Sequence, residues 1–248
     1  MASCPFIAIN EFFRTFQGRK CRDGGAGECS RCCPDNSRCR KRLIAEWVAP
    51  LAGPVIDAGC GPGHWTKFLA DQGAAVEGVD LVPAFIEQAT ARFPGIPFRV
   101  ASLTRLGVPD GYASGILAWY SLIHLEPARV SSVLQELARS MAPGGNLLLG
   151  FFESDEVQKI QHAITPAYSW PIEEAAQMLT AAGFEVVSHE NRTDPGRRPH
   201  ACISARLTAM STAKQQAAMA GTDWPRPAGG TRLRPPGTAR ARAPGCSW

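Results

Sequence analysis

The chain has 248 residues, of which 45% are hydrophobic, and its 26 Lys and Arg against 22 Asp and Glu give a net charge of +4. This length allows one large domain or one domain with appendages, and the apolar content suffices for a packed core. The sequence contains neither the ~18 consecutive apolar residues of a membrane-spanning helix nor the basic start and apolar stretch of a signal peptide. We therefore expect a cytoplasmic protein without a membrane span.

The first 42 residues are expected to form a poorly ordered extension that is rich in cysteine and basic residues. Near its start, Phe12, Phe13 and Phe16 fall on one face of a predicted helix. The cysteines follow among glycines and arginines, and they are Cys21, Cys29, Cys32, Cys33 and Cys39.

These cysteines leave three interpretations open: a zinc site, a basic loop, or a stretch outside the native reading frame of the ancestral gene, which the abrupt change in composition suggests. Cys29 and Cys32 form one C-x-x-C pair, whereas a structural zinc site usually needs two such pairs or a further ligand at regular spacing. The alternative is a basic loop that lacks the large apolar residues needed for order. Without a secretion signal, the odd total of nine cysteines favours free thiols or a metal in a reducing compartment.

An ordered pattern begins at Leu43 with the last turns of a helix, and an apolar run suited to a buried strand begins at Val55. The strand enters a turn in which Gly59, Gly61 and Gly63 alternate, and a helix is expected from Trp65 to Gln72. Glycine allows positive φ and close approach of a ligand to the main chain, and a helix start presents unpaired N–H groups. The pattern therefore predicts a nucleotide-binding corner.

A second strand, residues 75–80, ends at Asp80. This carboxylate lies about 20 residues beyond the turn, where a nucleotide-binding βαβ unit places the acceptor for ribose hydroxyl groups. The glycine spacing is not G-x-G-x-x-G, so a dinucleotide pyrophosphate is not the expected ligand.

Helices and strands continue to alternate to residue 207, and residues 208–248 form a tail rich in Pro, Gly, Ala and Arg that is expected to be disordered. Expected helices cover residues 83–93, 127–141 and 173–182. Expected strands cover residues 97–101, 146–152, 184–189 and 200–207, and residues 115–124 are expected to form the fourth strand and the loop after it.

Asp57, Gly59, Gly61 and Gly63 occupy the positions of the motif E/D-x-G-x-G-x-G, and this stretch resembles the class I S-adenosylmethionine-dependent methyltransferases. Residues 118–124 resemble small bacterial, especially actinobacterial, members of that family. A Pro-Gly-Gly after the helix at 127–141 is also typical of it. The resemblance covers residues 43–207. It implies an α/β, Rossmann-like, doubly wound and mostly parallel sheet with an antiparallel last strand, in three αβα layers.

The resemblance implies S-adenosyl-L-methionine as the cofactor and no metal at the site. Asp57 and the glycine turn would hold its methionine part, Asp80 its ribose, and the end of the third strand its adenine. A local turn formed by Ser102 is the alternative to adenine recognition. The cofactor-binding candidates are Asp57, Gly59, Cys60, Gly61, Gly63, Asp80, Leu81, Ser102, Leu103 and Ala118.

Tyr120 and His124 are the catalytic candidates, because they follow the fourth strand, and ligands of doubly wound sheets lie outside the carboxyl ends of the strands. Tyr120 would shape the acceptor pocket. His124 would be either a general base, given an unperturbed pKa near ~6.5, or a packing histidine. Residues 153–170 lie where relatives carry a segment that covers the substrate, and His162 could line the pocket there.

These patterns predict methyl transfer to an O, N or C nucleophile of a small molecule. One alternative is an RNA methyltransferase with an N-terminal zinc-binding segment, suggested by the cysteines and the two basic ends. The fourth strand is not followed by an Asn-Pro-Pro-Tyr-type motif, which argues against methylation of a base amino group. The other alternative is a protein that binds S-adenosylmethionine without catalysis.

Overall fold

The computed structural model of the chain describes residues 36–162, 165–194 and 196–208. The predicted N-terminal helix, the first four cysteines of the cluster and the C-terminal tail lie outside these residues. Only Cys39 of that cluster is described, as a free thiol on the first helix.

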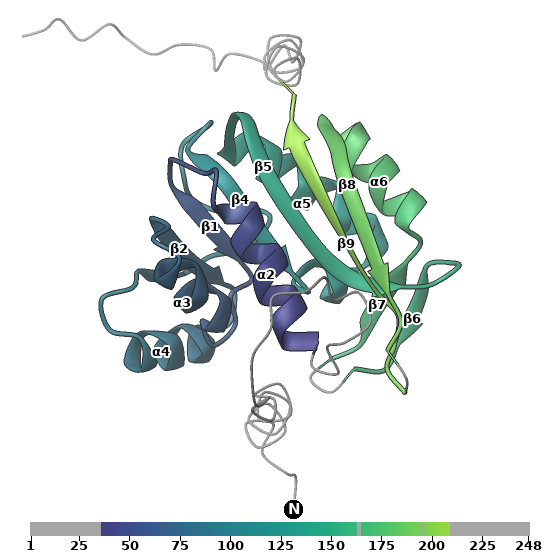
Figure 1. Cartoon of the computed structure of the whole chain (residues 1–248), viewed down its shortest axis with the longest axis horizontal. Helices are drawn as coiled ribbons and strands as arrows, with labels where there is room; N and C mark the ends of the chain where they lie inside the picture. The colour runs from purple at the N-terminus through teal and green to yellow at the C-terminus, as the bar shows by residue number, and fades with distance from the viewer. Residues whose placement is uncertain (1–35, 163–164, 195, 209–248) are drawn as a thin grey trace, which may run out of the picture.

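One sheet carries the functional residues, and its strand order is β3-β2-β1-β4-β5-β9-β8 (Figure 1). The first five strands run parallel, while β9 is antiparallel to both β5 and β8. This arrangement confirms the predicted doubly wound sheet with an antiparallel last strand. The strands are β1 (Val55–Ala58), β2 (Val76–Asp80), β3 (Phe98–Val100), β4 (Ala113–Trp119), β5 (Met141–Glu153), β8 (Phe184–Arg192) and β9 (His200–Leu207).

Helices cover the sheet on both sides, with α2 in front of it and α5 behind it in Figure 1. The helices are α2 (Asn36–Val48), α3 (His64–Asp71), α4 (Pro83–Arg92), α5 (Pro127–Ser140) and α6 (Ile172–Ala181), with a short 3₁₀ helix η1 (Leu122–His124). None of the helices in the described ranges is long and apolar enough to cross a membrane.

Two apolar clusters hold the layers together. Ile44 and Trp47 of α2 pack with Leu69 of α3 in the first cluster. The apolar stripe of α5, for example Leu137, packs with α6 and the sheet in the second. The helix α2 crosses the domain boundary that the sequence predicted between residues 42 and 43. Its first half is basic and its second half is apolar, so the sequence pattern did not indicate that the two halves form one helix.

Residues 153–170 differ from the expected covering segment. They form a hairpin of β6 (Gln158–Ile160) and β7 (Ala167–Trp170), and β7 pairs with β5 just beyond the point where β4 stops. Tyr168 and Trp170 are buried, so the described part of this segment extends the sheet.

The Pro-Gly-Gly sequence after α5 lies within a pairing irregularity, not ahead of the strand. Ala113 pairs with Met141, and the next pair of this ladder is Gly115 with Asn146. The intervening residues of β5 therefore bulge out of the ladder, and Gly144 takes a φ of +78° there.

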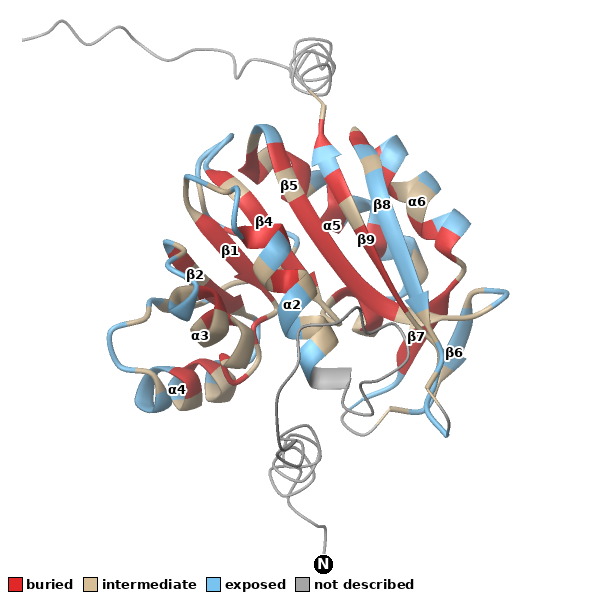
Figure 2. Cartoon of the chain, in the orientation of Figure 1, coloured by how far each residue is buried: buried red, intermediate tan, exposed pale blue. Residues whose placement is uncertain are grey.

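Burial is highest in the central strands β1, β4 and β5, whereas the edge strand β8 is largely exposed (Figure 2). Charged residues of β8 such as Glu185 and Glu190 line this edge, and charge on an edge strand disfavours pairing with another chain.

Replacing Phe184 with alanine tests the packing of β8 on the core. Its side chain is 2% exposed, whereas Val187 on the same strand is 55% exposed. Phe184→Ala should lower the free energy of unfolding by about 3–5 kcal/mol because it leaves a cavity, and Val187→Ala by less than about 0.5 kcal/mol. Urea denaturation measures both, and equal losses would contradict the described packing.

Candidate functional site

The glycine turn joins β1 to α3 at the carboxyl end of the sheet. Gly59, Gly61 and Gly63 have φ values of +81°, +52° and +80°. The N–H groups of Gly59 and Cys60 both donate to the carbonyl of Val79, at 2.8 and 2.9 Å. The turn is therefore fastened to β2, and its path requires residues that tolerate left-handed φ.

At two of these glycines, neighbouring side chains leave no room for a Cβ atom. At the third there is open space, which a ligand could occupy. A Cβ on Gly59 would lie 2.3 Å from the Cβ of Ser121, and one on Gly63 would lie 2.7 Å from the Phe98 ring. A Cβ on Gly61 would meet nothing within 4 Å. The turn is thus packed against the protein at its two ends and open at its centre, where a ligand can approach the main chain.

Asp80 connects this turn to the end of β2. Its Oδ2 accepts a hydrogen bond from the Gly61 N–H and its Oδ1 one from the Val82 N–H, both at 2.9 Å. A carboxylate oxygen can accept two hydrogen bonds, so each oxygen keeps one acceptor position. Asp80 therefore shapes the turn and can also accept hydroxyl groups of a ligand.

Asp57 lies beneath the turn and not on its open face. Its side chain is 1% exposed, and its Oδ2 accepts a 2.7 Å hydrogen bond from the hydroxyl of Thr66 in α3. Burial raises the pKa of the Asp57 carboxyl to about 7. The structure thus gives this residue the task of joining β1 to α3, and any effect on a ligand would pass through the turn above it.

Apolar side chains stand exposed at the carboxyl ends of β2 and β3. Leu81 is 66% exposed, and Val82 and Val100 are also exposed. Ser102 accepts a 3.2 Å hydrogen bond from the Thr104 N–H through its Oγ, which confirms the local turn as one role of this side chain. The neighbouring apolar surface is a suitable face for a flat heterocycle.

The remaining cofactor candidates have side chains turned into the protein. Ala118 and Cys60 are buried, and Leu103 packs against the core. Burial raises the pKa of the Cys60 thiol, so it stays protonated. These three residues can therefore offer mainly backbone groups to a ligand.

Tyr120 follows β4 in an unusual conformation. Its φ of +57° is positive, as for no other non-glycine residue in the described ranges, and such strain is concentrated at functional sites. The Tyr120 hydroxyl lies 2.7 Å from Nδ1 of His200, and its ring centroid lies 5.1 Å from that of Phe152. Burial raises the pKa of the Tyr120 hydroxyl, which keeps it neutral.

Three histidines lie close to the Phe152 ring or to one another, and one of them, His200, contacts Tyr120. The ring of His124 lies 5.2 Å from that of His162, and both His162 and His200 lie within 6 Å of Phe152. Burial lowers the pKa of all three, that of His200 to about 4. The three rings are therefore neutral at pH 7.

The contact of His124 with a carbonyl determines its tautomer. Its Nδ1 lies 3.3 Å from the carbonyl oxygen of Pro166. Because a carbonyl can only accept, Nδ1 carries the hydrogen and Nε2 keeps a lone pair. His124 can thus act as a proton acceptor through Nε2.

Ser121 and His200 are site residues that the sequence patterns did not indicate. The Ser121 Oγ is buried against Gly59 and has no hydrogen-bond partner among the described residues. Ser121 lies within the stretch 118–124 that already pointed to the site, whereas His200 begins β9 and carries no sequence signal. Buried hydroxyl groups normally have partners, so the Ser121 hydroxyl is an exception among the described residues.

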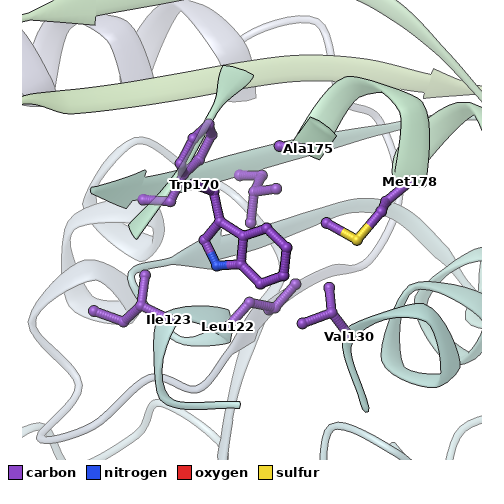
Figure 3. Close-up of a pocket in the computed structure, with 8 residues that line it drawn as sticks. Leu122, Ile123, Val130, Trp170, Ala175 and Met178 are labelled. Carbon is purple, nitrogen blue, oxygen red and sulfur yellow. The ribbon is translucent and has the colours of Figure 1, made fainter. Parts of the chain in front are cut away.

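An apolar pocket lies elsewhere, between η1, α5, α6 and the sheet. Figure 3 shows the indole of Trp170 among Leu122, Val130 and Met178. Its eight lining residues are all apolar, so it offers little to a charged ligand. The glycine turn and the residues around Tyr120 therefore remain the candidate functional site.

Most of the cysteines that could hold the predicted zinc ion lie outside the described residues. Within residues 36–162, 165–194 and 196–208, His, Cys, Asp and Glu side chains do not form a group of three or more that could hold a metal ion.

Alanine substitutions in the turn separate steric packing from backbone strain. Gly59→Ala should lower the free energy of unfolding by the ~1–2 kcal/mol of left-handed strain and by a further ~1–3 kcal/mol for the clash with Ser121. Gly61→Ala should cost only the strain, because its Cβ meets open space. Urea denaturation of both variants measures the difference, and equal costs would contradict the described packing.

Asp57 should make stability depend on pH. The folded state holds its proton up to a pKa of about 7, against an ordinary value of 3.8, so the folded protein binds more protons between these values. Its stability contribution is greatest below pH 4 and is lost as the pH rises through 7. Melting temperatures at pH 5 to 8 should fall for the wild type relative to Asp57→Asn. Asp71→Asn, an exposed substitution on α3, is the control. A difference in melting temperature between the wild type and Asp57→Asn that stays constant over this pH range would contradict the raised pKa of Asp57.

Part of this chain is similar to known methyltransferases. Residues 55–145 match the family model described as a methyltransferase domain. Trans-aconitate 2-methyltransferase of Methylobacterium nodulans is 36% identical over 153 residues, which are 58% of this chain and 56% of the relative. Malonyl-[acyl-carrier protein] O-methyltransferase of Erwinia billingiae is 28% identical over 160 residues, 62% of this chain and 61% of the relative. The matches thus span less than two thirds of either relative.

A solved structure extends the similarity beyond the matched domain. The 1,6-didemethyltoxoflavin-N1-methyltransferase of Burkholderia thailandensis, solved with 1,6-didemethyltoxoflavin and S-adenosylhomocysteine bound, superposes with a TM-score of 0.60. It is 25% identical, and the alignment covers 68% of this chain and 77% of that one. Residues 55–145 thus match a methyltransferase domain, and the strand order and the turn with its carboxylate are similar to those of the class I S-adenosylmethionine-dependent methyltransferases.

Proposed function

We propose that this protein transfers a methyl group from S-adenosylmethionine to an O, N or C nucleophile of a small molecule. The observation that carries the proposal is the open glycine turn bonded to Asp80 at the end of β2. The relatives named above act on small molecules or on a carrier-bound malonyl group, which supports a small acceptor.

The residues of the turn fit this cofactor. The open centre at Gly61 offers room for its amino acid part. Asp80 has acceptor positions for ribose hydroxyl groups. Leu81 and Val100 provide an apolar face for adenine, together with the backbone of Ser102 and Leu103.

The residues beyond β4 would hold the acceptor. S-adenosylmethionine supplies a methyl group activated by a positively charged sulfur. The protein then has to hold the reacting atoms within about 3–3.5 Å and exclude water. Tyr120 and Phe152 form an aromatic wall suited to that task, and Nε2 of His124 can take a proton from an acceptor that needs to lose one.

We also propose a cellular compartment for this activity and the extent of the catalytic domain. Cys39, Cys60 and Cys202 are free thiols, which fits a reducing compartment, and we place the protein in the cytoplasm. We propose that the catalytic domain runs from α2 to β9, with the segments on either side as extensions.

Substitution of Asp80 tests cofactor binding. Asp80→Asn should weaken the binding of S-adenosylhomocysteine at least about tenfold, because hydrogen bonds to a charged group are worth ~1.5–3 kcal/mol. Isothermal titration calorimetry on the full chain measures the affinity. Asp71→Asn is the matched control, since Asp71 is exposed and pairs with Lys67 on the outside of α3.

Absence of S-adenosylhomocysteine binding to the wild type would refute the proposed function. Binding without methyl transfer from labelled S-adenosylmethionine to any component of a cell extract would favour the non-catalytic alternative. Label found in RNA instead of small molecules would favour the RNA alternative.

A further inference from the structure

We propose that His200 is a positioning residue, which holds Tyr120 in the orientation in which this tyrosine meets the methyl acceptor. The inference rests on the proposed methyl transfer and adds a residue that acts through Tyr120. His200 lies outside residues 55–145, the part that matches the methyltransferase domain, so the contact involves a part of the chain that the domain match does not include.

The backbone of Tyr120 is held in a conformation that a tyrosine rarely adopts. Its φ is +57°, and a left-handed conformation costs free energy for a bulky side chain. Such a conformation persists only where the surrounding structure holds the residue in place. One of the contacts that does so is a 2.9 Å hydrogen bond from the Tyr120 N–H to the carbonyl of Gly150. That bond fixes the main chain, and the direction of the side chain depends on further contacts.

Three rings and one hydrogen bond restrain the Tyr120 side chain. Its ring centroid lies 5.6, 5.1 and 5.7 Å from those of Trp119, Phe152 and His200. Its hydroxyl lies 2.7 Å from Nδ1 of His200. Ring contacts allow a side chain to slide, whereas a hydrogen bond is directional. Among these three neighbours, His200 is therefore the one that also fixes the far end of the tyrosine.

The sheet holds His200 itself from both sides. His200 begins β9, where it pairs with Phe152 of β5 and with Arg192 of β8. Residues directly opposite each other in an antiparallel pair share one face of the sheet, and the ring centroids of His200 and Phe152 lie 5.5 Å apart. The carbonyl of Pro199 accepts a 3.0 Å hydrogen bond from the Glu153 N–H. The imidazole is thus a fixed point to which the tyrosine hydroxyl is bonded.

Both partners of this hydrogen bond are neutral at pH 7. Burial lowers the pKa of His200 to about 4 and raises the pKa of the Tyr120 hydroxyl. A phenol can donate or accept, and Nδ1 of a neutral imidazole does either according to the tautomer. The bond therefore holds the phenol oxygen in the same place for both tautomers of His200, and the contact can position the tyrosine without a change of protonation.

Small displacements of the acceptor wall are costly in methyl transfer. The reacting atoms have to be held within about 3–3.5 Å of each other, and a misplacement of about 1 Å can cost on the order of a hundredfold in rate. The cofactor turn is held by its own hydrogen bonds to Asp80 and to the Val79 carbonyl. Loss of the His200 contact should therefore slow methyl transfer and leave cofactor binding unchanged.

Nitrogen NMR of the full chain, labelled at histidine, tests the hydrogen bond. The chain has five histidines, and the chemical shift of each ring nitrogen reports its protonation and hydrogen bonding. The signals lost in His200→Asn identify His200. Tyr120→Phe, which removes only the hydroxyl, should shift the Nδ1 signal of His200 and leave the signals of the exposed His189 unchanged. An Nδ1 signal that stays in place would overturn the inference.

Three substitutions of His200 test its role in the reaction. Asparagine places an amide atom where Nδ1 lies and can donate or accept there, whereas glutamine places its amide farther out and leucine has none. His200→Gln and His200→Leu should lower label transfer from S-adenosylmethionine to the small-molecule fraction of a cell extract at least about tenfold. His200→Asn should restore it to within about threefold of the wild type. The affinity for S-adenosylhomocysteine, measured by calorimetry, should stay within about twofold in all three variants.

His189→Asn is the matched control, because His189 is exposed on the neighbouring strand β8, and it should change neither quantity. A wild type that fails to bind S-adenosylhomocysteine or to transfer label would refute the methyltransferase proposal, and the role of His200 with it. With an active wild type, full transfer by the glutamine and leucine variants, or no rescue by asparagine, would overturn the positioning role alone. A parallel loss of transfer and cofactor affinity would do the same, because it would indicate a general structural effect.

Discussion

The hydrogen bonds from the backbone of Gly61 and Val82 to Asp80 hold the functional end of the sheet in shape. They join the turn after β1 to the loop after β2, and the Val79 carbonyl adds two further bonds from the same turn. The chain therefore presents a preformed corner to its ligand, and less conformational freedom has to be lost on binding. The central position of this corner remains open because Gly61 has no side chain and no neighbour within 4 Å of where one would be.

The two ends of the site are built differently. The cofactor end comes from one continuous βαβ unit, in which sequence neighbours also lie close in space. The proposed acceptor end combines Tyr120 after β4, Phe152 of β5 and His200 of β9. Such a division allows the acceptor to vary among proteins of one fold while the cofactor site is kept, since function depends on the residues placed on a fold and not on the fold itself.

Burial determines the charge of this site. It keeps the Tyr120 hydroxyl and the Cys60 thiol protonated and the three histidines neutral at pH 7. Arginine is the side chain that best retains its charge under such conditions. Arg40, whose guanidinium carbon lies 6.0 Å from the centroid of the Tyr120 ring, therefore keeps its charge beside these neutral groups.

The sequence alone determined the alternation of strands and helices, the glycine turn and the carboxylate at Asp80, because these depend on local periodicity, on glycine conformation and on a fixed separation along one βαβ unit. It also indicated Tyr120 and His124, which lie at a strand end. Only the tertiary structure decided that Asp57 is buried under the turn, that residues 153–170 add a hairpin to the sheet, and that His200 and Arg40 reach Tyr120. The reason is that these features depend on the packing of the whole sheet, which leaves no local pattern in the sequence. Tyr120 and His200, for example, lie 80 positions apart along the chain.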